Sequence, residues 1–180
     1  MNHPSRIYAG FWTRVLAFAY DYLIIALYLA VLVGTGIIIN SAFPNTAALL
    51  FGNPISGQIS GFLTVTLPVT LYFALSEASH WQATWGKRKR RLKVIRTDGE
   101  PLSIPHAIGR NLLKFVPWEL AHTCIWQISF SPQDPSPLIT VGFVLVWVLV
   151  GANALSLITT KTHQSLYDRL AGTYVIVERT

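Results

Sequence analysis

The chain has 180 residues, of which 52% are hydrophobic and 12% are charged. Soluble domains usually carry about 25% charged residues, so the composition excludes an ordinary soluble protein and is typical of an integral membrane protein. The net charge is +6 and there is one cysteine, Cys124, which excludes an intramolecular disulfide.

The first apolar block, residues 14–39, is predicted to be a membrane-spanning helix. It is too long for the apolar region of a signal peptide and has no small-residue cleavage site. Arg14 begins the block and Asp21 lies within it, seven residues later and therefore on the same helix face. Two turns separate them by about 10 Å along the axis, too far for an easy direct ion pair, so we expect Arg14 to reach the lipid headgroups.

Asp21 is the main candidate for function in this block. A carboxylate inside a membrane must be protonated, bound to an ion or paired with another helix. Because acids within membrane spans are functional candidates by default, we interpret Asp21 as a proton- or ion-binding group. The alternative is a buried hydrogen bond that orients the helices.

The second predicted span covers residues 59–79 and contains Pro68. Membrane helices tolerate proline when neighbouring groups bind the carbonyl that it frees. A basic cytoplasmic loop, residues 80–106, follows this span, and attraction to anionic lipid explains its five consecutive cations more simply than nucleic-acid binding does. The expected lipid-binding residues are Lys87, Arg88, Lys89, Arg90 and Arg91.

Two short segments have the alternating apolar pattern of β-strands. LKVIRTDGEP reads as a strand closed by an Asp-Gly turn, and GTYVIVER lies near the C-terminus. We predict that Leu92–Arg96 pairs with Thr173–Val177 on the cytoplasmic side.

The third predicted span, residues 107–130, is less apolar than the fourth, residues 138–158. Arg110 and Lys114 lie in its first turns, and Pro117 is expected to bend it. A re-entrant or surface-lying segment is the alternative for this stretch.

The distribution of lysine and arginine predicts the topology. The 14 cations fall in three groups, and the loops at 40–58 and 131–137 contain none. The groups are Arg6 with Arg14, residues 87–114, and Lys161 with Arg169 and Arg179. Positive residues stay cytoplasmic, so both termini are predicted to lie inside, which requires an even number of spans and favours four over three.

Two Glu-x-x-His patterns, Glu77 with His80 and Glu119 with His122, are similar to those of di-metal carboxylate bundles. The pattern is short, so we predict no metal site and interpret Glu119 and His122 as polar residues lining the bundle interior. Asp168 follows Ser165 by three residues, which indicates a variant of the capping box at a short helix ended by Gly172.

Three features together resemble the RDD family of small membrane proteins, which is named for one arginine and two aspartates. They are Arg14 with Asp21, the stretch HQSLYDRLAGTYVIV, and the loop ATWGKRKRRLKVIRTDGEPLS. The resemblance places the family's three residues on Arg14, Asp21 and Asp168. Trp85 stands where the family usually has proline, and Tyr167 where it often has histidine. The resemblance implies a helical membrane protein, and a transport role, including for ions, has been suggested for the family.

We therefore predict an all-α membrane protein: a single domain over residues 1–180, with a four-helix transmembrane bundle and a small cytoplasmic β pairing. The first hypothesis is a cell-membrane transporter or cation/proton exchanger, and a homo-oligomer is expected because four short helices are thin for a transport path. An accessory membrane protein that binds a partner is the alternative, and a di-metal membrane protein is less favoured.

With no nucleophile triad, P-loop or dinucleotide fingerprint, no enzyme activity, cofactor or nucleic-acid partner is predicted. The candidate ion- or proton-binding residues are Arg14, Asp21, Asp168, Glu77, Glu119 and His122.

Overall fold

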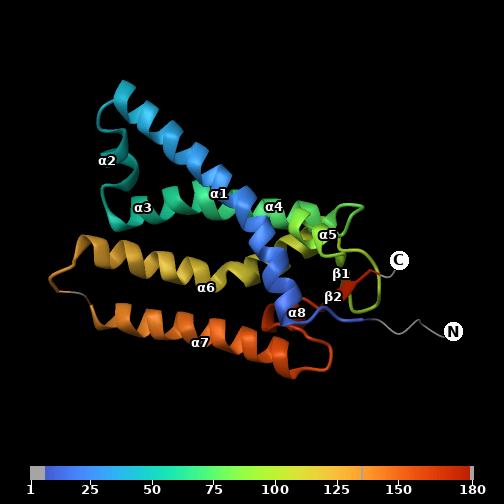
Figure 1. Ribbon diagram of the computed structural model, residues 1–180. Helices are drawn as coiled ribbons and strands as arrows, with labels where there is room; N and C mark the ends of the chain where they lie inside the picture. The colour runs from blue at the N-terminus through green and yellow to red at the C-terminus, as the bar shows by residue number, and fades with distance from the viewer. Residues whose placement is uncertain (1–6, 135, 179–180) are drawn as a thin grey trace. The chain divides into compact units, whose positions relative to one another are not determined.

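The computed structural model describes residues 7–134 and 136–178 and is mostly helical (Figure 1). Arg6 and Arg179, two of the cations used to predict topology, lie outside the described residues. In chain order the elements are α1 (Phe11–Ala42), α2 (Thr46–Phe51), α3 (Pro54–Gly61), the π-helical turn η1 (Phe62–Thr66), α4 (Leu67–Ala78), α5 (Trp85–Lys89), β1 (Leu92–Arg96), α6 (Ile104–Phe130), α7 (Pro137–Thr159), α8 (Leu166–Leu170) and β2 (Thr173–Val177).

Three helical stretches in the described chain are long and apolar enough to cross a membrane: Phe11–Ala42, Pro54–Ala78 and Pro137–Thr159. In the first and the third, only 6% of the most apolar window is buried within the protein. Their apolar side chains are therefore left for another apolar medium, as lipid provides. Helix α6 covers the predicted third span but is not among the three, because charged residues interrupt it.

The proline in the second span is accommodated by a π-helical turn. Pro68 lacks the N–H that would bind the carbonyl of Thr64, four residues earlier. Instead, the hydroxyl of Tyr28 on α1 donates to that carbonyl at 2.5 Å. A side chain from a neighbouring helix thus satisfies the freed carbonyl, and the turn η1 lies directly before the kinking residue.

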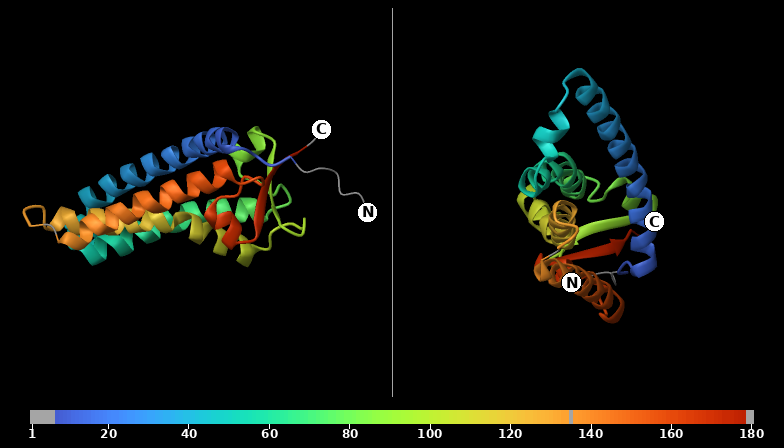
Figure 2. Two further views of the ribbon diagram at one scale, coloured as in Figure 1. Left: turned by 90° about the horizontal axis from the view of Figure 1, so that it is seen from below. Right: turned by 90° about the vertical axis from the view of Figure 1, so that its left-hand side faces the viewer.

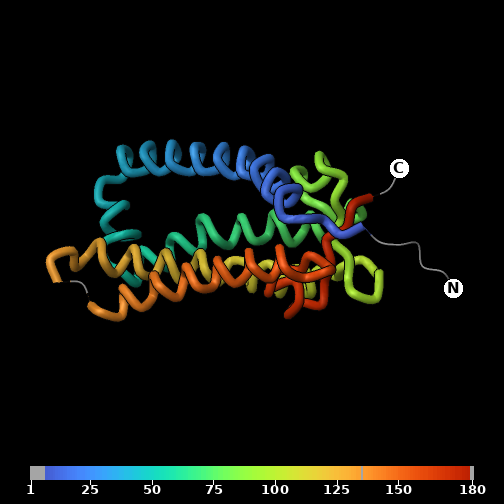
Figure 3. The backbone as a smooth tube through the Cα atoms, turned by 60° about the horizontal axis from the view of Figure 1, so that its bottom comes forward, coloured from blue at the N-terminus to red at the C-terminus, as the bar shows by residue number. Residues whose placement is uncertain are grey.

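The predicted strand pairing is confirmed. β1 and β2 are antiparallel, with Leu92 opposite Val177 and Val94 opposite Val175, and the right-hand view of Figure 2 shows them side by side. The N-terminal segment follows the other edge of β2 (Figure 3), where the N–H of Ala9 donates to the carbonyl of Val175 at 2.9 Å.

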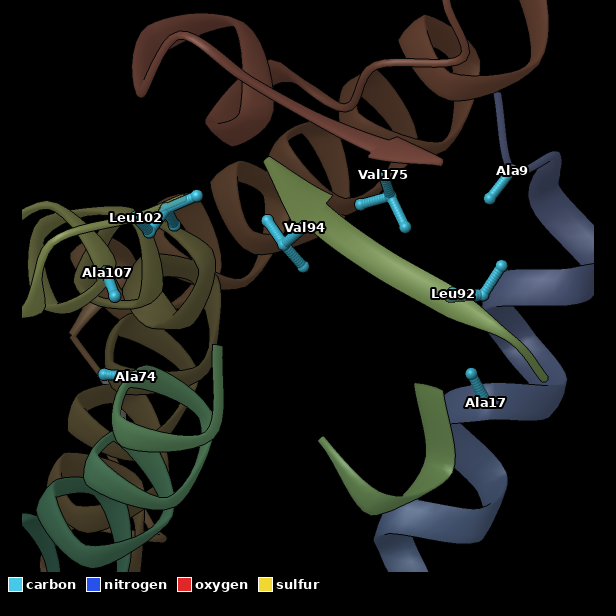
Figure 4. Close-up of a cluster of buried hydrophobic side chains, with 8 residues drawn as sticks. All are labelled: Ala9, Ala17, Ala74, Leu92, Val94, Leu102, Ala107 and Val175. Carbon is cyan, nitrogen blue, oxygen red and sulfur yellow. The ribbon is translucent and has the colours of Figure 1, made fainter. Parts of the chain in front are cut away.

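A small apolar core forms on one face of this sheet. Figure 4 shows Val94 and Val175 on the two facing strands, with Leu92 further along β1. Alanines from three helices join the cluster, Ala17 on α1, Ala74 on α4 and Ala107 on α6, and Ala9 and Leu102 complete it. Small side chains allow the helix backbones to approach the sheet closely.

The chain forms two compact units, each assembled from segments that are distant in sequence. Unit 1 comprises Met1–Ile24, Thr70–Lys114 and Gly151–Thr180, within which the described residues hold the sheet and its core. Unit 2 comprises Ile25–Val69 and Phe115–Val150.

The strand register can be tested by a disulfide. The backbone carbonyl of Val175 faces Ala9 rather than β1, so Val94 and Val175 form a non-hydrogen-bonded pair with Cα atoms about 4.5 Å apart, within disulfide range. Val94→Cys with Val175→Cys, in a Cys124→Ser background, should lose two hydrogens by mass spectrometry after mild oxidation. The matched pair Val94→Cys with Tyr174→Cys points its thiols to opposite faces and should stay reduced; equal oxidation of both pairs would contradict the register.

Candidate functional site

Asp21 is buried in unit 1 and held entirely by neutral donors. The hydroxyl of Tyr72 donates to its Oδ1 at 2.8 Å, and the hydroxyl of Thr84 donates to its Oδ2 at 2.6 Å. The N–H of Gly86 donates to Oδ1 at 2.7 Å. Within the described residues Asp21 makes no ion pair. Of the options open to an acid in a membrane span, the structure shows pairing with other elements, since Asp21 connects α1 with α4 and with the start of α5.

The loop that precedes β1 is shaped around this carboxylate. Thr84 caps α5, accepting from the N–H of Lys87 at 3.3 Å while its own hydroxyl donates to Asp21. At Gly86 a Cβ atom would lie 2.8 Å from the Asp21 Cγ and would overlap the carbonyl oxygen of Ala17. A glycine is therefore required where α5 meets α1.

Trp85 lies at the position where this loop departs from the RDD pattern, which usually has proline. It is the first residue of α5, the helix position at which proline is most readily accommodated. The residue is 39% exposed, and its ring contacts Tyr20 edge-on. Proline could take this helix position, but it would lose the backbone hydrogen bond that Trp85 makes to Tyr72, the residue whose hydroxyl binds Asp21.

Arg110 forms the centre of an ionic network beside this site. Its side chain is 1% exposed. One nitrogen, Nη1, donates to Glu77 Oε2 at 2.7 Å, while Nη2 and Nε donate to Asp168 Oδ1 at 2.6 and 3.1 Å. Lys87 donates to the other oxygen of Glu77 at 2.6 Å. Two acids that are distant in sequence thus share one buried guanidinium.

Arg14 joins the same network, so its side chain turns towards the protein interior instead of extending outwards to the membrane surface. Its Nη1 donates to Asp168 Oδ2 at 2.6 Å, its Nη2 to the carbonyl of His163 at 2.5 Å, and its Nε to the carbonyl of Ala9 at 3.0 Å. The side chain is 10% exposed. A buried acid within reach offers a stronger interaction than a hydrated headgroup does.

Asp168 acts both as a cap and as an ion-pair partner. The predicted capping box is confirmed, because Asp168 Oδ2 accepts from the N–H of Ser165 and the Ser165 hydroxyl accepts from the N–H of Asp168, both at 3.3 Å. Burial by itself raises the pKa of Asp168. The guanidinium groups of Arg110 and Arg14 outweigh that effect and hold the pKa well below its usual range.

Glu119 and His122 belong to unit 2, where they form a separate polar cluster. Glu119 accepts from the amide of Gln58 at 2.7 Å and from the hydroxyl of Thr66, and His122 Nδ1 lies 3.6 Å from its carboxylate. Residues 7–134 and 136–178 contain no group of three or more His, Cys, Asp or Glu side chains that could hold a metal.

The basic run divides between the interior and the surface. Lys87 turns inward to Glu77, whereas the four cations that follow it are exposed. Arg88 stacks over the ring of Trp81, with its Cζ 3.7 Å from the ring centroid. Lipid contact therefore remains a prediction for Arg88, Lys89, Arg90 and Arg91, and the position of Lys87 gives it a different role.

A cavity of about 230 Å³ lies beside Asp21 within unit 1. Phe11, Phe18 and Phe73 supply part of an apolar wall. The charged side chains that line it are Arg14, Asp21, Lys87, Arg110 and Lys114. Sequence analysis did not select Arg110 or Lys114; the signal available was their position in the first turns of a predicted span, where a cation needs a partner.

Asp168→Asn should destabilise the protein strongly. The variant leaves the buried Arg110 and Arg14 without their shared counter-charge, and breaking a buried pair costs about 3–5 kcal/mol. A lower denaturation midpoint in detergent would show this loss. Asp98→Asn is the control, because its partner Arg96 is exposed and surface pairs contribute about 0–1 kcal/mol.

The acid response of this pair has a defined sign. Because folding lowers the pKa of Asp168, its contribution to stability is complete above the ordinary aspartate value of about 3.9. The contribution is lost as pH falls below that value towards the folded pKa. Denaturation followed from pH 6 down to about pH 2 should show this loss in the wild type and a smaller one in Asp168→Asn; identical acid responses would contradict it.

Comparison with known proteins assigns the chain to a family. Residues 8–172 match the RDD family. The uncharacterized protein YxaI of Bacillus subtilis (strain 168) is 32% identical over 114 residues, which are 57% of this chain and 72% of that protein. No solved structure matches. Since the family match spans nearly the whole chain and includes Arg14, Asp21 and Asp168, the chain belongs to the RDD family.

Proposed function

We propose that this RDD-family protein is a membrane transporter or exchanger in which Asp21 takes up and releases a proton or a cation. The observation that carries the proposal is the position of Asp21, which is 1% exposed, lines a cavity and accepts hydrogen bonds from neutral groups. A transport carboxylate needs both access to a guest and an environment that tolerates two charge states.

The three buried acids of unit 1 differ in this respect. Glu77 and Asp168 are bound to guanidinium or ammonium groups, so neutralising either would leave a buried cation unpaired. Neutralising Asp21 breaks no ion pair among the described residues. The hydroxyls of Tyr72 and Thr84 can rotate from donating to accepting, so they can bind either the carboxylate or the carboxylic acid.

The proposal includes α6 as a fourth span. Its charged residues have partners that would reduce the cost of placing them in a bilayer. Arg110 binds two acids, and Glu119 accepts from Gln58 and Thr66. Lys114 Nζ lies 3.3 Å from the centroid of the Phe73 ring, a favourable cation–π position. Four spans in the cell membrane, with cytoplasmic termini, agree with the distribution of cations, and assembly of several copies would complete a transport path.

Labelling of single cysteines tests this topology. In a Cys124→Ser background, cysteines at Asn45 and Gln133 should react with an impermeant reagent applied to intact cells. Cysteines at Lys89 and Arg179 should react after the membrane is opened. Outside labelling at Arg179 would show an odd number of spans and remove α6 as a crossing helix.

A structural role for Asp21 is the second candidate, favoured by the three hydrogen bonds that connect α1, α4 and α5. Asparagine distinguishes the two roles at this position. Its carbonyl can accept from Gly86 and Tyr72 in place of Oδ1, and its amide can donate to the Thr84 hydroxyl in place of Oδ2. Asp21→Asn thus keeps the connections and removes the titration.

Flux through purified protein in liposomes, with and without a pH gradient, gives the decisive measurement. Asp21→Asn should insert and remain folded, with a denaturation midpoint near that of the wild type, yet lose flux that depends on the pH gradient. Asp98→Asn, an exposed acid outside the cavity, should transport normally. Wild-type flux from folded Asp21→Asn protein would return Asp21 to the structural role.

A further inference from the structure

The cavity beside Asp21 presents an excess of positive charge to any guest. Four cationic side chains line it, against the single carboxylate of Asp21. The four cations are Arg14, Lys87, Arg110 and Lys114. Glu77 and Asp168 pair with three of these cations but do not line the cavity. These two acids therefore offset part of the positive charge without facing a guest in the cavity.

Cations therefore outnumber acids at the cavity wall, even though Glu77 and Asp168 bind three of the cations from outside it. A cavity lined mainly by cationic donors attracts an anion that has several acceptor oxygens. We propose that this cavity binds a phosphate-class oxyanion.

The lining cations have the donor chemistry for such a guest. A guanidinium has five N–H donors, and Arg14 directs three of its hydrogen bonds to Ala9, His163 and Asp168. An ammonium has three donors, and Lys87 directs one to Glu77. Both lining side chains therefore have further N–H donors for an oxyanion with several acceptor oxygens.

The apolar wall indicates where the oxyanion would come from. Val15 and Phe18 line the cavity and are also 39% and 44% exposed on α1, a candidate membrane span. The acyl region of a phospholipid could rest on these side chains while its phosphate enters among the cations. Arg14 lies in the first turn of α1, the level at which headgroups meet a spanning helix. Free phosphate offers the same oxyanion but makes no use of the apolar wall.

This inference does not depend on transport. The cations attract the guest, whereas Asp21 is the lining acid that opposes it. Removing the Asp21 charge should therefore strengthen oxyanion binding, whether or not the same change abolishes flux.

Binding to purified protein in neutral detergent tests the site. Native mass spectrometry should show one retained molecule of phosphatidylglycerol and little phosphatidylcholine, and inorganic phosphate should be titrated separately against chloride. Lys114→Gln should weaken phosphatidylglycerol binding by about tenfold, the scale of one charge-assisted hydrogen bond. Lys114→Arg should retain binding, and so should Lys161→Gln, which removes an exposed cation outside both the cavity and the predicted lipid-contact residues.

The outcomes separate the sources of the oxyanion. Loss of phosphatidylglycerol in Lys114→Gln alone, with tighter binding in Asp21→Asn, supports a lipid headgroup. The same pattern with inorganic phosphate and no lipid retention supports a free anion. Absence of both ligands from wild-type protein, or equal losses in Lys114→Gln and Lys161→Gln, would overturn the proposal. If Lys114→Gln fails to fold, as judged by size-exclusion chromatography, unchanged or weaker binding in folded Asp21→Asn would overturn it.

Discussion

The burial of Arg110 is the constraint on which the organisation of unit 1 depends. A guanidinium removed from water costs several kcal/mol unless its charge and its donors are matched. Glu77 on α4 and Asp168 on α8 match them, and the same two acids then bind Lys87 and Arg14. Satisfying one buried charge therefore fixes the positions of segments from the beginning, middle and end of the chain.

The arginine and the two aspartates of the RDD pattern divide into two physical types. Arg14 and Asp168 form an ion pair inside a network that resists any change of charge. Asp21 is held by two hydroxyls and a backbone N–H, none of which is charged. The first pair therefore joins α1 to α8 through an ion pair, whereas Asp21 joins α1 to α4 and α5 through hydrogen bonds from neutral groups.

Local patterns in the sequence were sufficient for much of the fold and for part of the site. Hydrophobic runs and a two-residue alternation depend on neighbouring residues, so the apolar helices, the pairing of Leu92–Arg96 with Thr173–Val177 and the cap at Ser165 could all be predicted. The roles of Arg110 and Lys87 could not, because no local rule says which distant acid a cation will meet. Arg110 binds an acid 58 residues away. No local pattern indicated that Asp21 and Glu119 belong to different compact units.

The pairing of Arg14 with Asp168 also bears on how the protein is made. The two residues are 154 positions apart, so the first helix must enter the membrane long before its partner exists. At a synthesis rate of about 5–20 residues per second, that delay is about 10–30 s. During this interval Arg14 depends on water, lipid phosphate or the insertion machinery for a counter-charge. The ion pair between Arg14 and Asp168 can therefore form only after the last short helix, α8, has been synthesised.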